Sequence, residues 1–286
     1  MSTVLKGNEV AKALKEKMRV EVKDLREKNI IPKVGIIRMG DRPDDIAYEK
    51  GVIKSCGTVD IDSEVFQIPA ESSMEELINL VKKLNNDDNI HGILIFRPLP
   101  DHIDTEIIEN LIDPNKDIDC MNPINLEKVF EGEMDGFVPC TPKAVVEILK
   151  YYNIIPLEGA NIAVVNRSMV VGKPLSMMLL EERSTVTICH SRTKELPKIT
   201  SQSDIVVAAT GRAKMFGPEY FSEDNIVIDV GINDDGNGGI CGDVDYDNVA
   251  DKVKAITPVP GGVGSVTTTI LLNHVLISCK RMNNIK

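Results

Sequence analysis

The stretch Asn161–Leu180, NIAVVNRSMVVGKPLSMMLL, decides the fold of this chain. Its first five residues form an apolar, β-branched run, a short polar turn follows, and a second apolar run then continues with helical spacing. Further apolar strands are predicted at 185–190 (TVTICH), 203–211 (SDIVVAATG) and 225–233 (NIVIDVGIN). A strand, turn and helix followed by more strands is the skeleton of a Rossmann-type dinucleotide-binding domain.

The first half of the chain also alternates strands and helices. A chain of 286 residues can form two domains, and alternation of this kind predicts parallel sheets in a layered α/β fold. Ser73 and Glu76 have the spacing of a helix capping box. The predicted elements of this half are an amphipathic helix at 8–28, strands at 32–40, 63–69 and 92–100, and helices through Tyr48, over 72–85 and after Pro142.

The composition excludes several classes of protein. The formal net charge is -11, whereas a nucleic-acid surface needs clustered Lys and Arg, so we expect no nucleic-acid partner. No apolar run approaches the length of a membrane span or signal sequence, which predicts a cytoplasmic protein. The six cysteines form no C-x-x-C pair and the four histidines no H-E-x-x-H spacing, so we expect reduced thiols and no metal.

The predicted cofactor turn keeps little of the G-x-G-x-x-G fingerprint, because only Gly172 is present. The end of the next strand is more informative. It carries Ser191 and Arg192 and no carboxylate, and Arg167 lies in the neighbouring turn. A hydroxyl and two arginines suit the 2'-phosphate of NADP better than the 2'-hydroxyl of NAD, although a solvated basic turn has the same composition.

Other candidate ligand-binding residues follow the later strands. Thr210, Gly211 and Ile232 lie where parallel strands end, which is where ligands of such folds bind. The loop 257–268, TPVPGGVGSVTT, is rich in glycine and apolar residues, so its backbone can lie against a flat ligand. Its Pro260, Gly261 and Gly262 are candidate substrate contacts.

Over essentially its whole length, the sequence resembles the methylenetetrahydrofolate dehydrogenase/cyclohydrolase family. The resemblance rests on GDRPDDIAY, GILIFRPLP, DPNKDIDCMNP, PCTPKAV, NRSMVVGKPLSMMLL, TVTICHS, VIDVGIN, GDVDY and ITPVPGGVGSVTT. It implies a three-layer α/β catalytic domain over 1–145 and 268–286, a Rossmann domain over 146–267, a folate cleft between them, and a homodimer. It also implies cofactor contacts at Asn166, Arg167, Ser168, Ser191 and Ile232, with Asn166 where the family usually has glycine.

The chain departs from the family in its active-site helix. The family motif S-x-x-Y-x-x-x-K is represented by Asp45, Tyr48 and Val52, so the lysine is absent. A side chain four residues after Tyr48 lies about 40° from it on a helix, whereas Lys50 and Lys54 lie roughly 200° and 240° away. The family's G-I-L-V-Q-L-P-L-P is here GILIFRPLP, which replaces the glutamine by Phe96. The resemblance places Tyr48 and Asp119 against the pteridine.

These departures predict one activity rather than two. Hydride transfer from methylenetetrahydrofolate needs orientation and exclusion of water, whereas hydrolysis of the methenyl product needs a positioned polar group. We therefore expect an NADP-dependent methylenetetrahydrofolate dehydrogenase with weak or absent cyclohydrolase activity. One alternative is a bifunctional enzyme in which Lys54, Arg97 or another group substitutes for the lysine. Another is a folate- or dinucleotide-binding protein without turnover.

Overall fold

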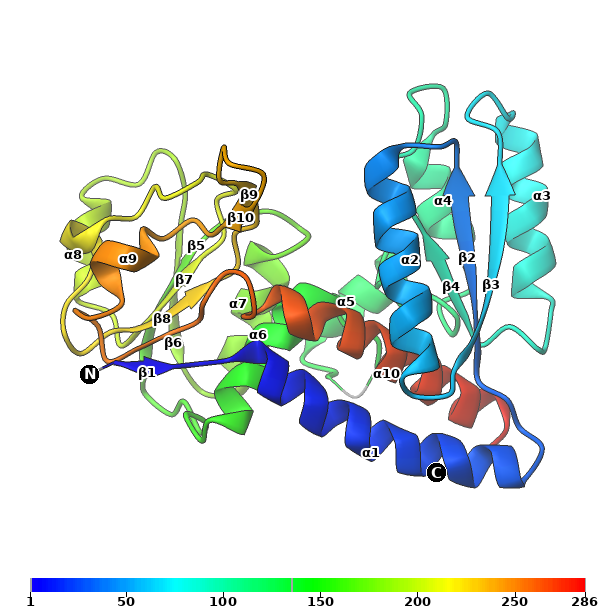
Figure 1. Cartoon of the computed structure of the whole chain (residues 1–286), viewed down its shortest axis with the longest axis horizontal. Coiled ribbons are helices and arrows are strands. Elements are labelled where there is room, and N and C mark those ends of the chain that lie inside the picture. The colour runs from blue at the N-terminus through cyan, green and yellow to red at the C-terminus, as the bar shows by residue number, and fades with distance from the viewer. Residues whose placement is uncertain (1, 135, 286) are drawn as a thin grey trace. The chain divides into compact units, whose positions relative to one another are not determined.

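The computed structural model describes residues 2–134 and 136–285, which form two compact units (Figure 1). We call them the six-stranded unit and the three-stranded unit, after the larger sheet in each. The six-stranded unit comprises Met1–Lys12, Val129–Met134 and Pro139–Thr267. The three-stranded unit comprises Ala13–Lys128, Asp135–Val138 and Thr268–Lys286.

The sheet of the six-stranded unit is parallel, with the order β1-β11-β8-β7-β5-β6. Its members are β1 (Thr3–Val4), β5 (Asn161–Val165), β6 (Thr185–Cys189), β7 (Ile205–Ala208), β8 (Ile226–Asp229) and β11 (Ala255–Ile256). The sequence order reverses at β5, because β6 pairs with one of its edges and β7 with the other. In open α/β sheets, such a reversal is where ligands bind.

Strand β1 extends this sheet in a way that the sequence analysis did not predict. Thr3 and Val4 pair with Ala255 and Ile256 of β11, so the beginning of the chain lies in the same sheet as strands from its second half. Nearby, the amide of Asn8 donates to the carbonyl of Gly261 at 3.3 Å. The N-terminal segment therefore supports the glycine-rich loop 257–268.

The remaining elements of the six-stranded unit connect its strands. A turn at 235–239 joins two short antiparallel strands, β9 (Asn233–Asp234) and β10 (Ile240–Cys241). A core cluster that includes Val165, Val206 and Phe216 fills the interior of this unit. The helices are α6 (Cys140–Tyr151), α7 (Gly172–Glu181), α8 (Leu196–Ser201), α9 (Tyr246–Val249) and the 3₁₀ helix η1 (Pro218–Tyr220).

The three-stranded unit contains a parallel sheet with the order β3-β2-β4. The strands are β3 (Asp62–Ile68), β2 (Lys33–Met39) and β4 (Gly92–Ile95), with helices α2 (Pro43–Gly57), α3 (Met74–Asn85) and α4 (Thr105–Leu111). Helices α1 (Gly7–Glu27), α5 (Pro123–Glu131) and α10 (Gly264–Met282) have residues in both units. The predicted capping box of α3 is confirmed, with Ser73 and Glu76 each accepting from the other's backbone amide.

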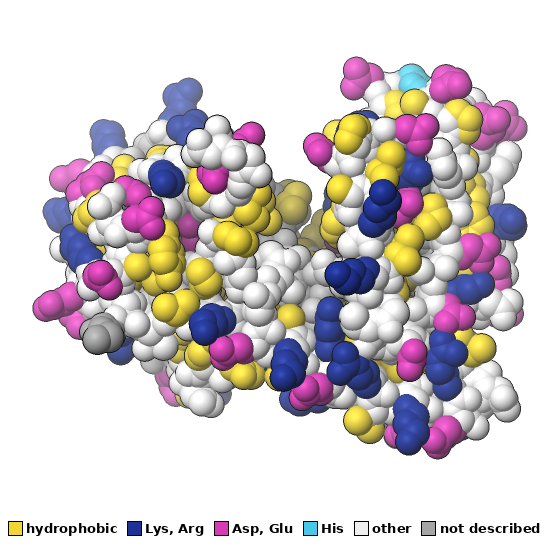
Figure 2. Space-filling view, in the orientation of Figure 1, with side chains coloured by type: hydrophobic (Ala, Val, Ile, Leu, Met, Phe, Trp, Pro, Cys, Tyr) yellow, Lys and Arg dark blue, Asp and Glu magenta, His cyan; other side chains and the backbone are white. Residues whose placement is uncertain are grey.

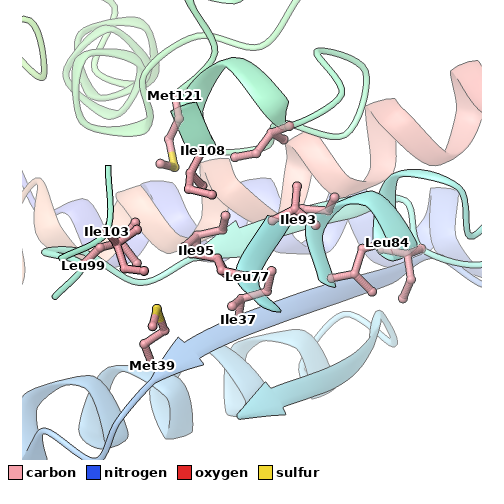
Figure 3. Packing of buried hydrophobic residues seen from close by; sticks show 13 residues of the cluster. Ile37, Met39, Leu77, Leu84, Ile93, Ile95, Leu99, Ile103, Ile108 and Met121 are labelled. Atoms are coloured by element: carbon pink, nitrogen blue, oxygen red, sulfur yellow. The ribbon is translucent and has the colours of Figure 1, made fainter. Parts of the chain in front are cut away.

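Apolar side chains from one face of β2 and β4 and from α3 and α4 form a core cluster of the three-stranded unit. Ile37 of β2 and Ile93 of β4 point toward Leu77 and Leu84 of α3, and Ile108 of α4 joins them (Figure 3). All five side chains are almost fully buried. Burial of this kind holds α3 and α4 on the sheet and leaves the strand ends to carry polar residues.

The predicted two-domain α/β class with parallel sheets is confirmed. The domain boundaries and the cleft stay predictions. The six cysteines are free thiols. Among the described residues, no group of three or more His, Cys, Asp or Glu is placed to hold a metal, and no helix is long and apolar enough to cross a membrane. On the face shown in Figure 2, acidic and basic side chains are intermixed.

Candidate active site

Asn166 organises the turn after β5. Its Oδ1 accepts from the amides of Ser168 at 2.7 Å and Gly172 at 3.1 Å, and its Nδ2 donates to the carbonyl of Ala209 at the end of β7. Its position at the fork between β5 and β7 is the expected ligand crevice. A Cβ on Gly172 would come within 2.1 Å of the Asn166 carbonyl oxygen, so the chain approaches itself there more closely than a side chain permits. An amide thus shapes the turn at a position where the family usually has glycine.

A cavity of about 530 Å³ opens beside this turn, at the ends of β5, β6 and β7. Of the predicted cofactor residues, Asn166, Arg167, Ser191 and Thr210 line it. Arg192 is exposed and is not among the described lining residues, and its backbone amide donates to His190 Nδ1 at 3.1 Å. A guanidinium and a hydroxyl therefore converge on this cavity, and these are groups that suit a phosphate.

Sequence reasoning missed other residues of this cavity. Arg212 and Glu195 add charged groups to its lining, although neither follows the expected strand-end pattern. Arg212 lies two residues beyond the Thr210 that was predicted. Glu195 adopts a left-handed conformation (φ 52°) before α8. The other lining residues that were not predicted are Val165, Cys189, His190, Thr193, Leu196, Pro197, Met215 and Tyr220.

A second cavity, of about 250 Å³, lies between the end of β8 and the loop 257–268 of the same unit. It is lined by Ile232, Pro260, Gly261 and Gly262, so the structure brings these four predicted residues together. Gly261 has φ 97°, which residues with a side chain rarely adopt. An added Cβ on Gly7 would come within 1.9 Å of the Gly262 carbonyl oxygen, which places the N-terminal segment directly against this loop.

In the three-stranded unit, Tyr48 and Phe96 lie together. Their ring centroids are 5.2 Å apart with an interplanar angle of 49°. Tyr48 is 46% exposed, whereas Phe96 is 5% and Val52 is 0% exposed. The position four residues after Tyr48 is therefore filled by hydrocarbon inside the core, and the aromatic ring that replaces the family's glutamine contacts Tyr48.

Asp119 is held by Arg97, which follows β4. Arg97 Nη2 lies 2.9 Å from Asp119 Oδ2, and Nη1 lies 3.8 Å from Glu109 Oε1. Burial raises the pKa of Glu109, and the charge of Arg97 opposes that shift. The sequence analysis considered Arg97 only as a substitute for the lysine, yet its guanidinium is engaged with two carboxylates.

Buried ionic groups fix the elements that carry these side chains. Arg38, at the end of β2, is almost fully buried and lies 2.7 Å from Glu49 and 2.8 Å from Asp41, so it holds α2 to the sheet. The hydrogen bond to Glu49 raises the pKa of Arg38. Asp117 accepts from the amides of Met121 and Asn122 at 2.8 Å and thereby shapes the loop around Asp119. Burial raises the pKa of Asp117.

The two lysines near Tyr48 are exposed. Lys50 and Lys54 both lie on α2, and the described hydrogen bonds and ion pairs include no bond from either ammonium group. The structure thus brings together Tyr48 and Phe96 with Val52 close behind on the same helix, and it pairs Asp119 with Arg97. The roles of these residues stay predictions.

The chain matches known proteins along almost its entire length. Residues 5–119 match the model described as tetrahydrofolate dehydrogenase/cyclohydrolase, catalytic domain, and residues 139–283 match that of the NAD(P)-binding domain. A protein named bifunctional protein FolD from Clostridium botulinum (strain Hall) is 57% identical over 281 residues, covering 98% of this chain and 99% of that protein. Bifunctional protein FolD 1 from Desulfitobacterium hafniense is 56% identical over 280 residues, with 98% and 99% covered.

Solved structures agree with these sequence relatives. The bifunctional enzyme FolD, methylenetetrahydrofolate dehydrogenase/cyclohydrolase, from Campylobacter jejuni superposes with a TM-score of 0.95 at 38% identity, covering 98% of this chain and 99% of that one. The Trypanosoma brucei methylenetetrahydrofolate dehydrogenase-cyclohydrolase, solved with NADP cofactor and inhibitor, gives a TM-score of 0.91 at 33% identity, with 98% of each chain covered. Two domain models of the family match the chain, its relatives are more than half identical to it, and its fold is theirs. The chain therefore belongs to the tetrahydrofolate dehydrogenase/cyclohydrolase family.

Proposed function

We propose that the chain is an NADP-dependent methylenetetrahydrofolate dehydrogenase whose cyclohydrolase activity is weak or absent. The observation that carries the second part is the environment of Tyr48. Val52 is completely buried and Phe96 packs against the Tyr48 ring, so hydrocarbon fills both positions at which the family has polar groups. The first part rests on family membership and on the two cavities of the six-stranded unit.

The residues of the six-stranded unit fit NADP. Arg167 and Ser191 would bind the 2'-phosphate, the turn after Asn166 would lie beside the pyrophosphate, and Ile232 with Pro260, Gly261 and Gly262 would support the nicotinamide. When bound, NADP supplies the hydride acceptor. Gly172 permits the close approach of backbone that such a turn requires.

The two reactions of the folate substrate make different demands on the protein, which is why one can be kept while the other is lost. The hydride leaves its methylene carbon, and the product cation is stabilised by its own two nitrogens, so this step needs no protein base. Tyr48 would orient the substrate and Asp119 would bind its pteridine, with Arg97 holding the carboxylate in place. Hydrolysis of the cation instead needs water activated by a polar group, a contribution of about 100- to 10,000-fold.

The decisive experiment measures both reactions on one preparation of the purified chain. We expect rapid NADP reduction with methylenetetrahydrofolate, while absorbance of methenyltetrahydrofolate decays at its spontaneous rate. Formyl-folate released at the dehydrogenase rate would refute the proposal. NADP binding without turnover would support the non-catalytic alternative instead.

A gain-of-function variant sharpens this test. The double variant Val52→Lys/Phe96→Gln places the family's two polar groups at these positions beside Tyr48. We expect methenyl hydrolysis to rise about 100-fold or more above the spontaneous rate. Ile53→Lys is the matched control, because it adds a lysine at an exposed position of the same helix. If hydrolysis rises equally in Ile53→Lys, a lysine at position 52 has no specific role in it.

A bifunctional enzyme is the second candidate, and it is favoured by relatives that are named bifunctional proteins. Two residues were considered as substitutes for the lysine. Arg97 cannot act as a base, because a guanidinium does not deprotonate in proteins, and it is paired with Asp119. If the wild-type protein does hydrolyse the methenyl product, Lys54→Met and Arg97→Leu should separate the contributions of the two residues.

The proposed homodimer and cytoplasmic location rest on the resemblance and on the composition. Analytical ultracentrifugation at micromolar concentration should give a mass near twice the 31.5 kDa of one chain. A single 31.5 kDa species that is fully active would contradict the dimer.

A further inference from the structure

One buried carboxylate connects the two cavities of the six-stranded unit. Asp243 is 0% exposed and lies just after β10, outside every strand that lines the cavities. Its Oδ2 accepts from the hydroxyl of Thr210 at 3.0 Å, from the amide of Gly211 at 3.0 Å, and from the amide of Thr210. Its Oδ1 accepts from the amide of Arg212 at 2.9 Å. The segment that follows β7 is thus wrapped around a single side chain.

The same carboxylate also holds the segment after β8. Asn233 Nδ2 donates to Asp243 Oδ1 at 2.9 Å, and a Cβ on Gly231 would come within 2.1 Å of that oxygen. Gly231 and Ile232 line the cavity beside the glycine-rich loop, whereas Thr210 and Arg212 line the cavity beside Asn166. Asp243 therefore sets the spacing between residues of both cavities.

A second carboxylate fixes Asp243 itself. Asp229, at the end of β8, accepts from the amides of Asp243 at 3.0 Å, Val244 at 2.9 Å and Gly231 at 3.0 Å. A Cβ on Gly242 would come within 1.9 Å of Asp229 Oδ2, so the chain before Asp243 is pressed against the strand end. Buried carboxylates that accept several amide hydrogen bonds make stiff connections, since each lost bond leaves a buried charge less satisfied.

We infer that Asp243 is a positioning residue for the dinucleotide, which holds the adenosine-side and nicotinamide-side segments at the separation that bound NADP requires. The inference rests on the proposed function, because it takes both cavities to receive one cofactor. Asp243 lines neither cavity among the described residues, so it acts through Thr210 and Arg212 on one side and Gly231 on the other. Replacing Asp243 should therefore weaken the binding of NADP and leave the binding of the folate unchanged.

The test compares two isosteric exchanges at opposite ends of one sheet. Asp243→Asn places an amide group against donors. Asn225→Asp is the matched control, because Asn225 is also 0% exposed and precedes β8 at the amino end. Its Oδ1 accepts from the Ser222 amide at 2.7 Å and its Nδ2 donates to the Ser203 carbonyl, so this exchange places an oxygen against an acceptor. We expect Asp243→Asn to raise the Kd and KM for NADP about tenfold or more, with the KM for methylenetetrahydrofolate unchanged. The comparison requires that both variants have similar thermal midpoints. Asn225→Asp should then change neither the Kd nor the KM for NADP.

Each outcome is decisive. An unchanged Kd for NADP in folded Asp243→Asn, or equal losses in both variants, would overturn the inference. If Asp243→Asn does not fold, Asn233→Ala decides, because it removes one hydrogen bond to the carboxylate; we expect a rise of about threefold or more in the Kd for NADP, and no rise would overturn the inference. Wild-type protein that fails to bind NADP in calorimetry would overturn the proposed function as well.

Discussion

Arg167 and Ser191 illustrate how two strand ends bring two polar side chains to one cavity. They line the same cavity although 24 positions separate them, because the parallel strands β5 and β6 end side by side. A guanidinium makes charge-assisted hydrogen bonds with a phosphate, and it has no comparable partner in a ribose hydroxyl. The preference for NADP thus depends on a few atoms at one edge of the sheet.

Replacing Arg167 by alanine should change the choice of cofactor. Loss of a charge-assisted contact of about 1.5–3 kcal/mol should raise the KM for NADP roughly 10- to 100-fold and leave the KM for NAD nearly unchanged. Steady-state rates with each cofactor provide the measurement. Arg183→Ala is the control, because this exposed arginine lies at the end of α7 and pairs with Glu158. Equal losses with both cofactors would argue against a phosphate contact.

The residue scale also shows what sequence reasoning could reach. Tyr48, Val52 and Phe96 were identified because the resemblance aligned them with the family's motifs, and their contacts agree with that alignment. The pairing of Arg97 with Asp119 was missed, because nothing in the sequence says that side chains 22 positions apart meet. Asp243 was missed for the same reason, since its hydrogen bonds come from donors more than 30 positions earlier and from Asn233.

At the scale of elements, α3 depends on the residue that caps its N-terminus. Ser73 accepts from the Glu76 amide at 3.2 Å, while Glu76 accepts from the Ser73 amide at 2.7 Å. Ser73→Ala should lower the free energy of unfolding by about 1 kcal/mol, because one helix amide loses its partner. Urea unfolding followed by circular dichroism measures the change. Glu71→Ala, an exposed change in the preceding turn, should leave stability within about 0.5 kcal/mol.

His91 makes the three-stranded unit sensitive to pH. It precedes β4, is 5% exposed, and its Nδ1 accepts from the Lys33 amide at the start of β2. Burial lowers the pKa of His91 to about 4. The unfolded chain takes up this proton below about pH 6.5, whereas the folded chain resists it until about pH 4, so stability falls as the pH drops through this window.

His91 should contribute no more than about 1.4 kcal/mol per pH unit to the slope of the free energy of unfolding between pH 6.5 and 4. His91→Asn keeps an acceptor for the Lys33 amide and does not titrate, so its stability should depend less on pH in that window. Urea midpoints at several pH values provide the test, with the exposed His102→Asn as control. Parallel curves for wild type and His91→Asn would show that another group is responsible.

At the scale of the whole molecule, NADP should stabilise the chain. Ligand at 100 times its Kd adds about 2.7 kcal/mol to the free energy of unfolding, and at 1,000 times about 4.1 kcal/mol. We expect the thermal midpoint to rise with NADP concentration and to rise less with NAD at the same concentration. Differential scanning calorimetry measures both series. Equal rises with the two cofactors would contradict the proposed preference.

The architecture was largely predictable from the sequence because its strands are continuous Val- and Ile-rich runs, as in β5 and β7, and such runs mark buried parallel strands. Strand β1 was not predictable. It has only two residues, and its partner β11 lies about 250 positions away, so neither periodicity nor local composition indicates the pairing. The boundary of the catalytic domain at 1–145 stays a prediction. The observed six-stranded unit includes Met1–Lys12, which that prediction assigns to the other domain.

The pairing of β1 with β11 has a consequence for biosynthesis. Thr3 and Val4 are synthesised about 250 residues before their partners Ala255 and Ile256. At about 5–20 residues per second, synthesis of the intervening chain takes roughly 12–50 seconds, during which the first strand has no native partner. The pairing of β1 with β11 can therefore form only after Ile256 has been synthesised, so this edge of the sheet is completed later than the pairing of β5 with β6 and β7.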